Sequence, residues 1–180
     1  MRTEQRIETL RLVLTRPTLA DAPEIFERYA SDPEVVRYLS FPRHETIMAT
    51  YGFLKMSDKE WAVWPAGPYL IRSRESGVLL GGTGISFETP WRAMTGYVLA
   101  KDSWGRGYAT EVLEAMVALS ERLRIVRLYA LCHPAHSASQ HVLTKCGFNQ
   151  EGLWKRHSVF PNMVQDDPMD TVCYAKILSD

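Results

Sequence analysis

Apolar and polar residues follow two different periods along this chain, and segments of the two kinds interleave. Runs of alternating or continuous apolar residues, bounded by glycine, proline or charged residues, predict strands. The expected strands cover residues 10–15, 64–73, 78–87, 94–100, 126–132, 148–153 and 171–178. Segments with helical spacing or helix-start residues predict helices over 18–29, 44–59, 111–122 and 136–145, with a short helical turn over 32–38. The alternation predicts a mixed α/β fold.

Size and composition narrow this expectation. The chain has 180 residues, of which 46% are apolar and 23% charged, as in a soluble globular protein, and we expect a single domain over residues 1–180. The 21 basic and 21 acidic side chains cancel, so we expect no nucleic-acid partner that depends on a strongly basic surface. No apolar stretch approaches about 18 residues, so no membrane span is expected. The polar N-terminus does not resemble a signal peptide, which favours a cytoplasmic protein.

The three cysteines are Cys132, Cys146 and Cys173. They are widely spaced and lie among apolar neighbours, which predicts buried thiols in a reducing compartment. No two of them form a Cys-x-x-Cys pair, so no metal site is expected.

One short segment carries the strongest chemical signal. Gly105 and Gly107 lie one residue apart, between the strand over 94–100 and the helix over 111–122. Such a turn directs unpaired backbone N–H groups outward at the positive end of a helix, and glycine allows close approach of an anion. The alternative to an anion-binding turn is a glycine turn that serves only the packing of the strand and the helix. The segment lacks the Gly-Lys-Ser/Thr ending of a P-loop and, about 20 residues on, the carboxylate of a dinucleotide fingerprint.

A second segment, residues 133–148, follows a strand and ends in a glycine-capped helix with Lys145-Cys146-Gly147-Phe148. Together with the opening over 8–17, the Ser-Asp-Pro-Glu-Val run over 31–35 and the glycine turn, it makes four motifs in order. In these motifs the chain resembles the GCN5-related N-acetyltransferase (GNAT) superfamily, in particular its RimJ/RimL-like branch. The resemblance covers nearly the whole chain. It implies a mixed, mostly antiparallel sheet of six to seven strands, flanked by helices and splayed to admit acetyl-CoA.

The resemblance also implies how the acyl donor is held. Backbone groups of the glycine turn would bind the pyrophosphate of acetyl-CoA, and the end of the preceding strand would pair with its pantetheine arm. No metal is implied. The implied cofactor-binding residues are Val98, Leu99, Ala100, Trp104, Gly105, Arg106, Gly107, Tyr108, Ala109, Thr110, His136 and Ser139.

Two of these positions depart from the family pattern. Trp104 stands where Gln or Arg is usual, so the grip on phosphate should rest on main-chain groups. His136 stands where Asn is usual. Its imidazole can donate or accept a hydrogen bond and can titrate near neutral pH, or it can simply face solvent at the start of a helix.

The implied reaction is direct attack of a neutral primary amine on the thioester, through a tetrahedral intermediate. It needs a base for the ammonium and an acid for the departing thiolate. Ser139 is the candidate acid or orienting group, against the alternative of a serine bonded to its own helix. Glu88 is the nearest candidate base, against the alternatives of a solvated turn residue and of a water chain without a dedicated base.

The acceptor implied by the resemblance is a small-molecule amine or a protein N-terminus, and the protein is expected to be a monomer or homodimer. Trp61, Trp64 and Trp91 fall in segments that would border the acceptor entrance, although most aromatic residues are expected to fill the core. Two other classes stay open. One is a non-catalytic CoA-binding or sensory module on the same fold, and the other is a nucleotide-binding α/β protein that uses the glycine turn for another phosphate.

Overall fold

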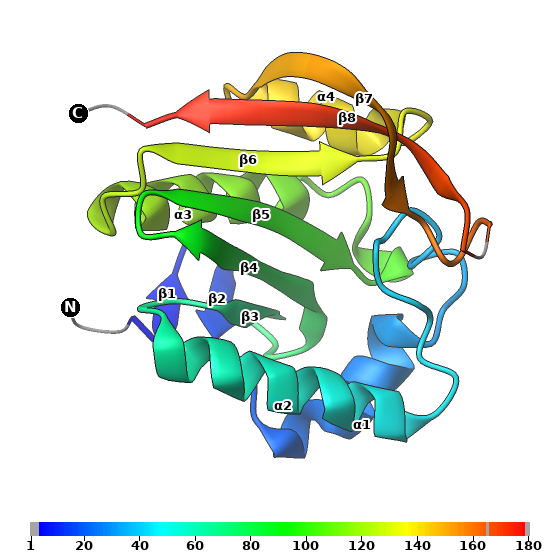
Figure 1. Cartoon of the computed structure of the whole chain (residues 1–180). Coiled ribbons are helices and arrows are strands. Elements are labelled where there is room, and N and C mark those ends of the chain that lie inside the picture. Colours follow the sequence, from blue (N-terminus) through cyan, green and yellow to red (C-terminus); the bar gives the residue numbers. More distant parts are fainter. Residues whose placement is uncertain (1–3, 165, 179–180) are drawn as a thin grey trace.

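A single sheet organises the computed structural model, which describes residues 4–164 and 166–178. Over these residues eight strands pair in the order β1-β2-β3-β4-β5-β6-β8-β7 (Figure 1). The strands are β1 (Arg6–Glu8), β2 (Leu12–Thr15), β3 (Pro68–Ser73), β4 (Leu79–Thr89), β5 (Arg92–Leu99), β6 (Arg127–Cys132), β7 (Asn149–Val159) and β8 (Pro168–Ile177). Neighbouring strands are antiparallel except β5 and β6, which are parallel. The expected mixed, mostly antiparallel sheet is confirmed, with eight strands in place of six or seven because β1 is too short to show an alternating pattern.

Helices cover both faces of this sheet. They are α1 (Ala22–Ile25), α2 (Ile47–Val63), α3 (Tyr108–Arg122) and α4 (Ser137–Lys145). A 3-10 turn precedes α1 and a π-helical turn, Phe26–Ala30, follows it, so the helix expected over 18–29 is present but irregular. Figure 1 shows α3 and α4 behind the sheet, with α1 and α2 beside β3. Among the described residues, no helix combines the length and the apolar character needed to cross a membrane.

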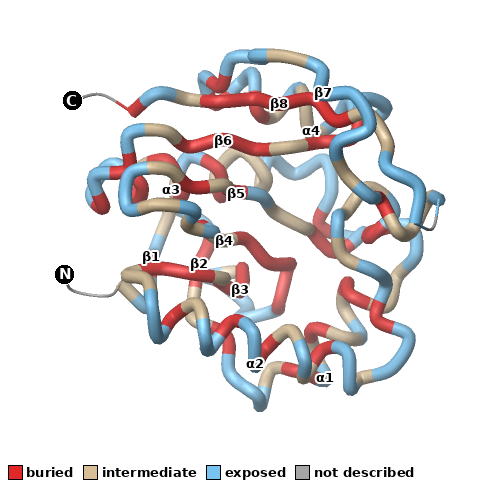
Figure 2. The backbone as a smooth tube through the Cα atoms, in the orientation of Figure 1, coloured by how far each residue is buried: buried red, intermediate tan, exposed pale blue. Residues whose placement is uncertain are grey.

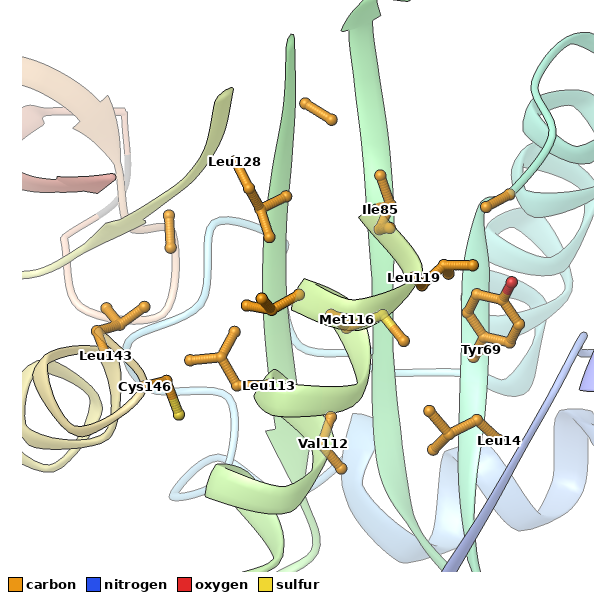
Figure 3. Packing of buried hydrophobic residues seen from close by; sticks show 14 of the residues in the cluster. Leu14, Tyr69, Ile85, Val112, Leu113, Met116, Leu119, Leu128, Leu143 and Cys146 are labelled. Atoms are coloured by element: carbon orange, nitrogen blue, oxygen red, sulfur yellow. The ribbon is translucent and has the colours of Figure 1, made fainter. Parts of the chain in front are cut away.

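The main core lies between α3 and the sheet. Val112, Leu113, Met116 and Leu119 are all at most 1% exposed and pack against side chains of β2, β3, β4 and β6 (Figure 3). Complete burial of one such side chain stabilises a fold by about 1.5–3 kcal/mol. Figure 2 shows the same pattern as buried stretches along β6, β8 and the inner side of α3. The glycine turn is therefore attached to a helix that the core holds firmly.

Four of the element boundaries that differ from the expectation affect the site. Helix α2 runs on to Val63, and β3 starts only at Pro68, because Trp64 precedes a proline and takes an extended conformation that ends the helix. Helix α3 starts at Tyr108 instead of residue 111, so the last part of the glycine segment belongs to the first helical turn. Strand β7 extends to Val159, six residues beyond its expected end.

A gap in the sheet opens between the two parallel strands. Strands β5 and β6 pair only where Arg92, Ala93 and Met94 face Arg127, Leu128 and Tyr129. Beyond Met94 the described residues give β5 no strand partner on that side, and in Figure 1 the two strands diverge toward their C-terminal ends. The glycine turn follows the end of β5 and so lies at the mouth of this gap.

Candidate functional site

The free edge of β5 faces the gap. The N–H of Ala100 donates to the carbonyl of Leu80 on the β4 side at 2.8 Å. Because backbone groups alternate in direction along an antiparallel strand, Val98 also turns toward β4, whereas Tyr97 and Leu99 turn toward the gap. Of the expected stretch 98–100, only Leu99 therefore presents backbone groups to the gap. Tyr97, which precedes that stretch, joins Leu99 at the edge.

The side chain of Trp104 has a role that the sequence did not indicate. Its indole N–H donates to the carbonyl of Leu99 at 2.7 Å. That bond occupies the outward carbonyl of the last β5 residue and fixes the start of the glycine turn against the strand. Leu99 is left with its N–H as the group directed into the gap.

The glycine turn has the shape of an anion seat. Gly105 and Gly107 have φ values of 70° and 78°, in the left-handed region that glycine tolerates best. Gly107 is the N-cap of α3, and the first helical bond runs from the N–H of Glu111 to its carbonyl at 3.3 Å. The N–H groups of Tyr108, Ala109 and Thr110 precede that bond, so they have no partner within the helix. A methyl group added at Gly105 would meet nothing within 4 Å, so the turn is open in front.

Arg11 fastens the turn from one side. Its Nη1 donates to the carbonyl of Arg106 at 2.9 Å, and its Nε donates to the Glu111 carboxylate at 2.7 Å. The same carboxylate accepts from the N–H of Arg11 at 2.8 Å and from the Thr9 hydroxyl at 2.6 Å. Burial would raise the pKa of Glu111, but these hydrogen bonds outweigh it and hold the pKa below its ordinary 4.5. The opening segment of the chain thus links the middle of the turn to an ionised carboxylate in the first part of α3.

Arg28 fastens the other side. Both of its terminal nitrogens donate to the Asp102 carboxylate at 2.9 Å, while its Nε donates to the carbonyl of Leu79 at 2.9 Å. The hydrogen bond from Arg28 lowers the pKa of Asp102. Two open cavities of about 350 and 250 Å³ lie beside the turn and share Tyr108 in their lining. Ser139 and His136 line neither cavity, so the gap, and not these cavities, joins the two sequence motifs.

The second motif reaches the gap through α4. Ser139, in the first turn of α4, is half-buried and lies near Tyr97. Burial raises the pKa of Tyr97, and the nearby Ser139 hydroxyl partly opposes that rise. A hydroxyl on α4 and a phenol on the free edge of β5 therefore meet across the gap.

The imidazole of His136 does not simply face solvent. His136 is the N-cap of α4, and its ring stacks on Tyr38 with 4.7 Å between the ring centroids and 18° between the ring planes. Burial, and secondarily the nearby His133, lower the pKa of His136 below 6.5. The ring is therefore mostly neutral near pH 7.

Glu88 is engaged elsewhere. Its carboxylate accepts a hydrogen bond from the Tyr129 hydroxyl and pairs with Nε of Arg92 at 2.5 Å. Tyr97 pairs with Thr83 on β4, and Glu88 lies five residues further along that strand, about 16 Å at the usual rise. The structure thus separates the two candidate catalytic residues, Ser139 and Glu88. It ties Glu88 to the face of the sheet opposite α3, where Tyr129 packs.

The aromatic border expected around an acceptor is only partly present. Trp61 is 5% exposed, packs edge-on against Tyr69 and donates to a backbone carbonyl, so it is a core residue. Trp64 stacks on Phe87 with 4.9 Å between the ring centroids. Trp91 alone of the three is largely exposed. The helical extension of α2 explains why Trp61 is buried, because it places Trp61 on the inner face of a helix instead of ahead of a strand.

The three cysteines are buried and free, as expected. Burial raises the pKa of Cys132 to about 11, so its thiol is protonated near neutral pH. Within the parts of the chain that the structure describes, no three His, Cys, Asp or Glu side chains gather so as to hold a metal ion.

The sequence did not single out four residues that close the wide end of the gap. Tyr38, His133 and Phe160 bring their rings together there, and Asn162 hydrogen-bonds the loop that carries Tyr38. His133 lay inside the second motif, but only as a neighbour of His136. Asn162 lies in a stretch that the sequence predicts only as a loop. Nothing in the neighbouring residues indicates its contacts with residues 36–43.

Comparison with known proteins identifies related sequences. A family model described as acetyltransferase (GNAT) domain matches residues 11–149. The uncharacterized N-acetyltransferase YoaA of Bacillus subtilis (strain 168) is 29% identical over 178 residues, which cover 94% of this chain and 94% of the relative. The uncharacterized N-acetyltransferase p20 of Bacillus licheniformis is 26% identical over 152 residues, which cover 83% and 85%.

Solved structures share the fold. An acetyltransferase of the GNAT family from Bacillus anthracis superposes with a TM-score of 0.83 at 21% identity, over 97% of this chain and 99% of that one. RimL, a ribosomal L7/L12 alpha-N-protein acetyltransferase in complex with coenzyme A, superposes with a TM-score of 0.81 at 21% identity, over 96% and 98%. At these identities the likeness extends to the fold alone.

Proposed function

This chain belongs to the GNAT acetyltransferase family, and we propose that it transfers an acetyl group from acetyl-CoA to a primary amine. One observation carries the proposal. An unpaired strand edge in the middle of the sheet leads directly into a left-handed glycine turn at the N-terminus of a buried helix. A strand edge suits an extended, amide-containing arm, and a helix N-terminus suits a pyrophosphate. Acetyl-CoA carries both groups.

The residues proposed to hold acetyl-CoA follow from this match. The N–H groups from Gly105 to Thr110 would bind the pyrophosphate, since three of them lack a helical partner and the turn is open in front. Backbone groups of Tyr97 and Leu99 would pair with the extended arm. His136 and Ser139 would approach it from α4. Acetyl-CoA, when bound, supplies an acetyl group activated as a thioester.

Ser139 is the proposed proton donor or orienting group at the sulfur. Its half-buried side chain lies near Tyr97, whose pKa the Ser139 hydroxyl lowers in part. We propose no base role for Glu88, because Tyr129 and Arg92 already engage its carboxylate. Deprotonation of the incoming amine is left to water at the open side of the gap.

The acceptor class rests on two supports. The fold is shared with RimL, which is named as an acetyltransferase of a ribosomal protein. It is also shared with MccE, a microcin self-immunity acetyltransferase solved with acetyl-CoA and AMP. A protein N-terminus and a small-molecule amine are therefore both proposed as acceptors.

A non-catalytic CoA-binding module is the second candidate function. The engagement of Glu88 favours it, because Tyr129 and Arg92 already bind the carboxylate that was the candidate base. Such a module would bind CoA without turnover.

A thermal-shift panel of acetyl-CoA, CoA, ATP and NAD tests the cofactor. Stabilisation by the first two is expected, and stabilisation by ATP or NAD alone would contradict the proposal. A thiol-release screen with amines and short peptides then tests turnover, which a CoA-binding module would lack. In that screen Ser139→Ala should slow release tenfold or more without weakening CoA binding. Thr144→Ala is the matched control, since it removes an exposed hydroxyl from the same helix.

A further inference from the structure

Three connections meet at the wide end of the gap, where β6 ends (Figure 1). The α1–α2 connection contributes Tyr38, the β6–α4 connection contributes His133 and His136, and the β7–β8 connection contributes Phe160. Tyr38 stacks on both histidines, with ring centroids 5.4 Å and 4.7 Å away, and His133 packs edge-on against Phe160 at 5.0 Å. The two contacts of Tyr38 join residues that are 95 and 98 positions apart in the sequence, and His133 and Phe160 are 27 positions apart.

One amide side chain fixes this arrangement. Asn162 accepts a hydrogen bond from the N–H of Arg43 at 2.7 Å and donates to the carbonyls of Val36 and Phe41, both at 2.8 Å. All three of these hydrogen bonds join the Asn162 amide to backbone groups of one loop, residues 36–43. Val36 and Phe41 lie on either side of Tyr38, so the two donated bonds hold the ends of the segment that presents the Tyr38 ring.

The imidazoles suit a stacked cluster. The N–H of Ala135 donates to Nδ1 of His133 at 3.1 Å, so the ring is bonded through its unprotonated nitrogen. Burial lowers the pKa of both His133 and His136, and the guanidinium of Arg37 lowers that of His133 further. Neutral rings pack against Tyr38 without an uncompensated charge.

We infer that Asn162 is a positioning residue that holds Tyr38 against His136, so that the loop over 36–43 and the N-terminus of α4 respond to the cofactor as one unit. The inference rests on the proposed function, which places His136 beside bound acetyl-CoA. A ligand that immobilises His136 also removes the freedom of the stacked Tyr38 ring. Since Asn162 holds both ends of the Tyr38 segment, the whole loop loses mobility. Occupancy of the cofactor site would thus shape the wide end of the gap, where the acceptor enters.

Hydrogen exchange of the full chain with and without CoA tests this inference. In the wild type, CoA should slow exchange at residues 105–110 and also at residues 36–43, by threefold or more at each. In Asn162→Ala the protection at 105–110 should remain while that at 36–43 is lost. Asn149→Ala is the matched control, because Asn149 is exposed on the edge strand β7 and should leave both effects unchanged.

Variants of Tyr38 provide the same test if Asn162→Ala does not fold. Tyr38→Ala removes the ring but keeps the three bonds of Asn162, and it should abolish protection at 36–43. Tyr38→Phe keeps the ring and should restore it. Protection at 105–110 alone in the wild type, or undiminished protection at 36–43 in both Asn162→Ala and Tyr38→Ala, would overturn the inference and leave the proposed function intact. Absence of protection at 105–110 as well would overturn both.

Discussion

Distant side chains hold both the glycine turn and the loop over 36–43, but the two segments depend on them differently. Arg11 reaches the turn through an ion pair and a bond to the Arg106 carbonyl, whereas Asn162 reaches the loop through three uncharged hydrogen bonds. The turn also has local reasons for its shape, namely two glycines with positive φ and the start of a buried helix. The loop has neither helix nor strand, and it has an internal backbone bond from the N–H of Leu39 to the carbonyl of Val36 at 2.9 Å. Arg11 therefore secures a turn that has several local determinants, while the loop depends more strongly on Asn162.

The largest effect is expected where the turn depends on its glycines. The double variant Gly105→Ala/Gly107→Ala places two Cβ atoms in the left-handed region and should lower the free energy of unfolding by about 3 kcal/mol. Because the seat itself is distorted, affinity for acetyl-CoA should fall more than tenfold. Urea denaturation and titration calorimetry measure the two quantities.

Gly52→Ala is the control for that variant. Gly52 lies inside α2 with an ordinary φ and open space around it, so alanine should stabilise the protein by about 0.5–1 kcal/mol and leave affinity unchanged. A loss of stability at Gly52 similar to that of the double variant would show that strain in the turn is not the cause.

The next effect concerns the loop. Asn162→Ala removes the partner of the Phe41 carbonyl and of the Arg43 N–H and one of the two donors to the Val36 carbonyl, and it should lower the free energy of unfolding by about 2 kcal/mol. Asn149→Ala should change it by less than about 0.5 kcal/mol. Urea denaturation separates the two, and equal effects would contradict the structural role of Asn162.

A smaller effect is expected when the fastening of the turn is cut. Arg11→Ala should cost about 1 kcal/mol of stability, because the ion pair with Glu111 is partly exposed, and should weaken acetyl-CoA binding about threefold. Arg11→Lys should not restore binding, since one ammonium group cannot reach Glu111 and the Arg106 carbonyl together. Arg6→Ala, which breaks an exposed pair far from the turn, should leave affinity unchanged.

The smallest effect is a difference in pH dependence between the two regions. The pKa values of His133 and His136 are lowered by folding, so their contribution is complete above the unfolded value of 6.5 and declines as pH falls through the lower folded values. The pKa of Glu111 is also lowered, so its contribution is lost only below about pH 4.5.

The midpoints of urea denaturation between pH 3 and 8 show in which pH range each contribution is lost. His136→Gln should flatten the decline that begins below pH 6.5, and Glu111→Gln should flatten the decline below pH 4.5. Burial also lowers the pKa of His44, so this residue contributes to the decline below pH 6.5 in all variants. The comparison therefore relies on differences from the wild type. Flattening in the same pH range for both variants would contradict the assignment.

Much of the fold was accessible from the sequence because it is encoded locally. Helix α3 shows its apolar face directly, and the glycines of the turn are explained by their φ values. The features that the sequence left open are either short or depend on distant residues. Strand β1 has three residues, and the groups of Val98 and Ala100 turn toward β4 because of a register that only strand pairing defines. The separation of Glu88 from Ser139 likewise follows from their places in the sheet.

The order of most elements, the glycine turn and the family resemblance could be predicted from the sequence alone, because each rests on residues close together in the chain. Three features become visible only in the tertiary structure. They are the backbone groups that face the gap, the hydrogen bond from Trp104 to the carbonyl of Leu99, and the bonds by which Asn162 holds the loop around Tyr38. These contacts join residues whose neighbours in sequence do not indicate them. Their geometry is set by packing against the whole sheet, so no local pattern could have predicted it.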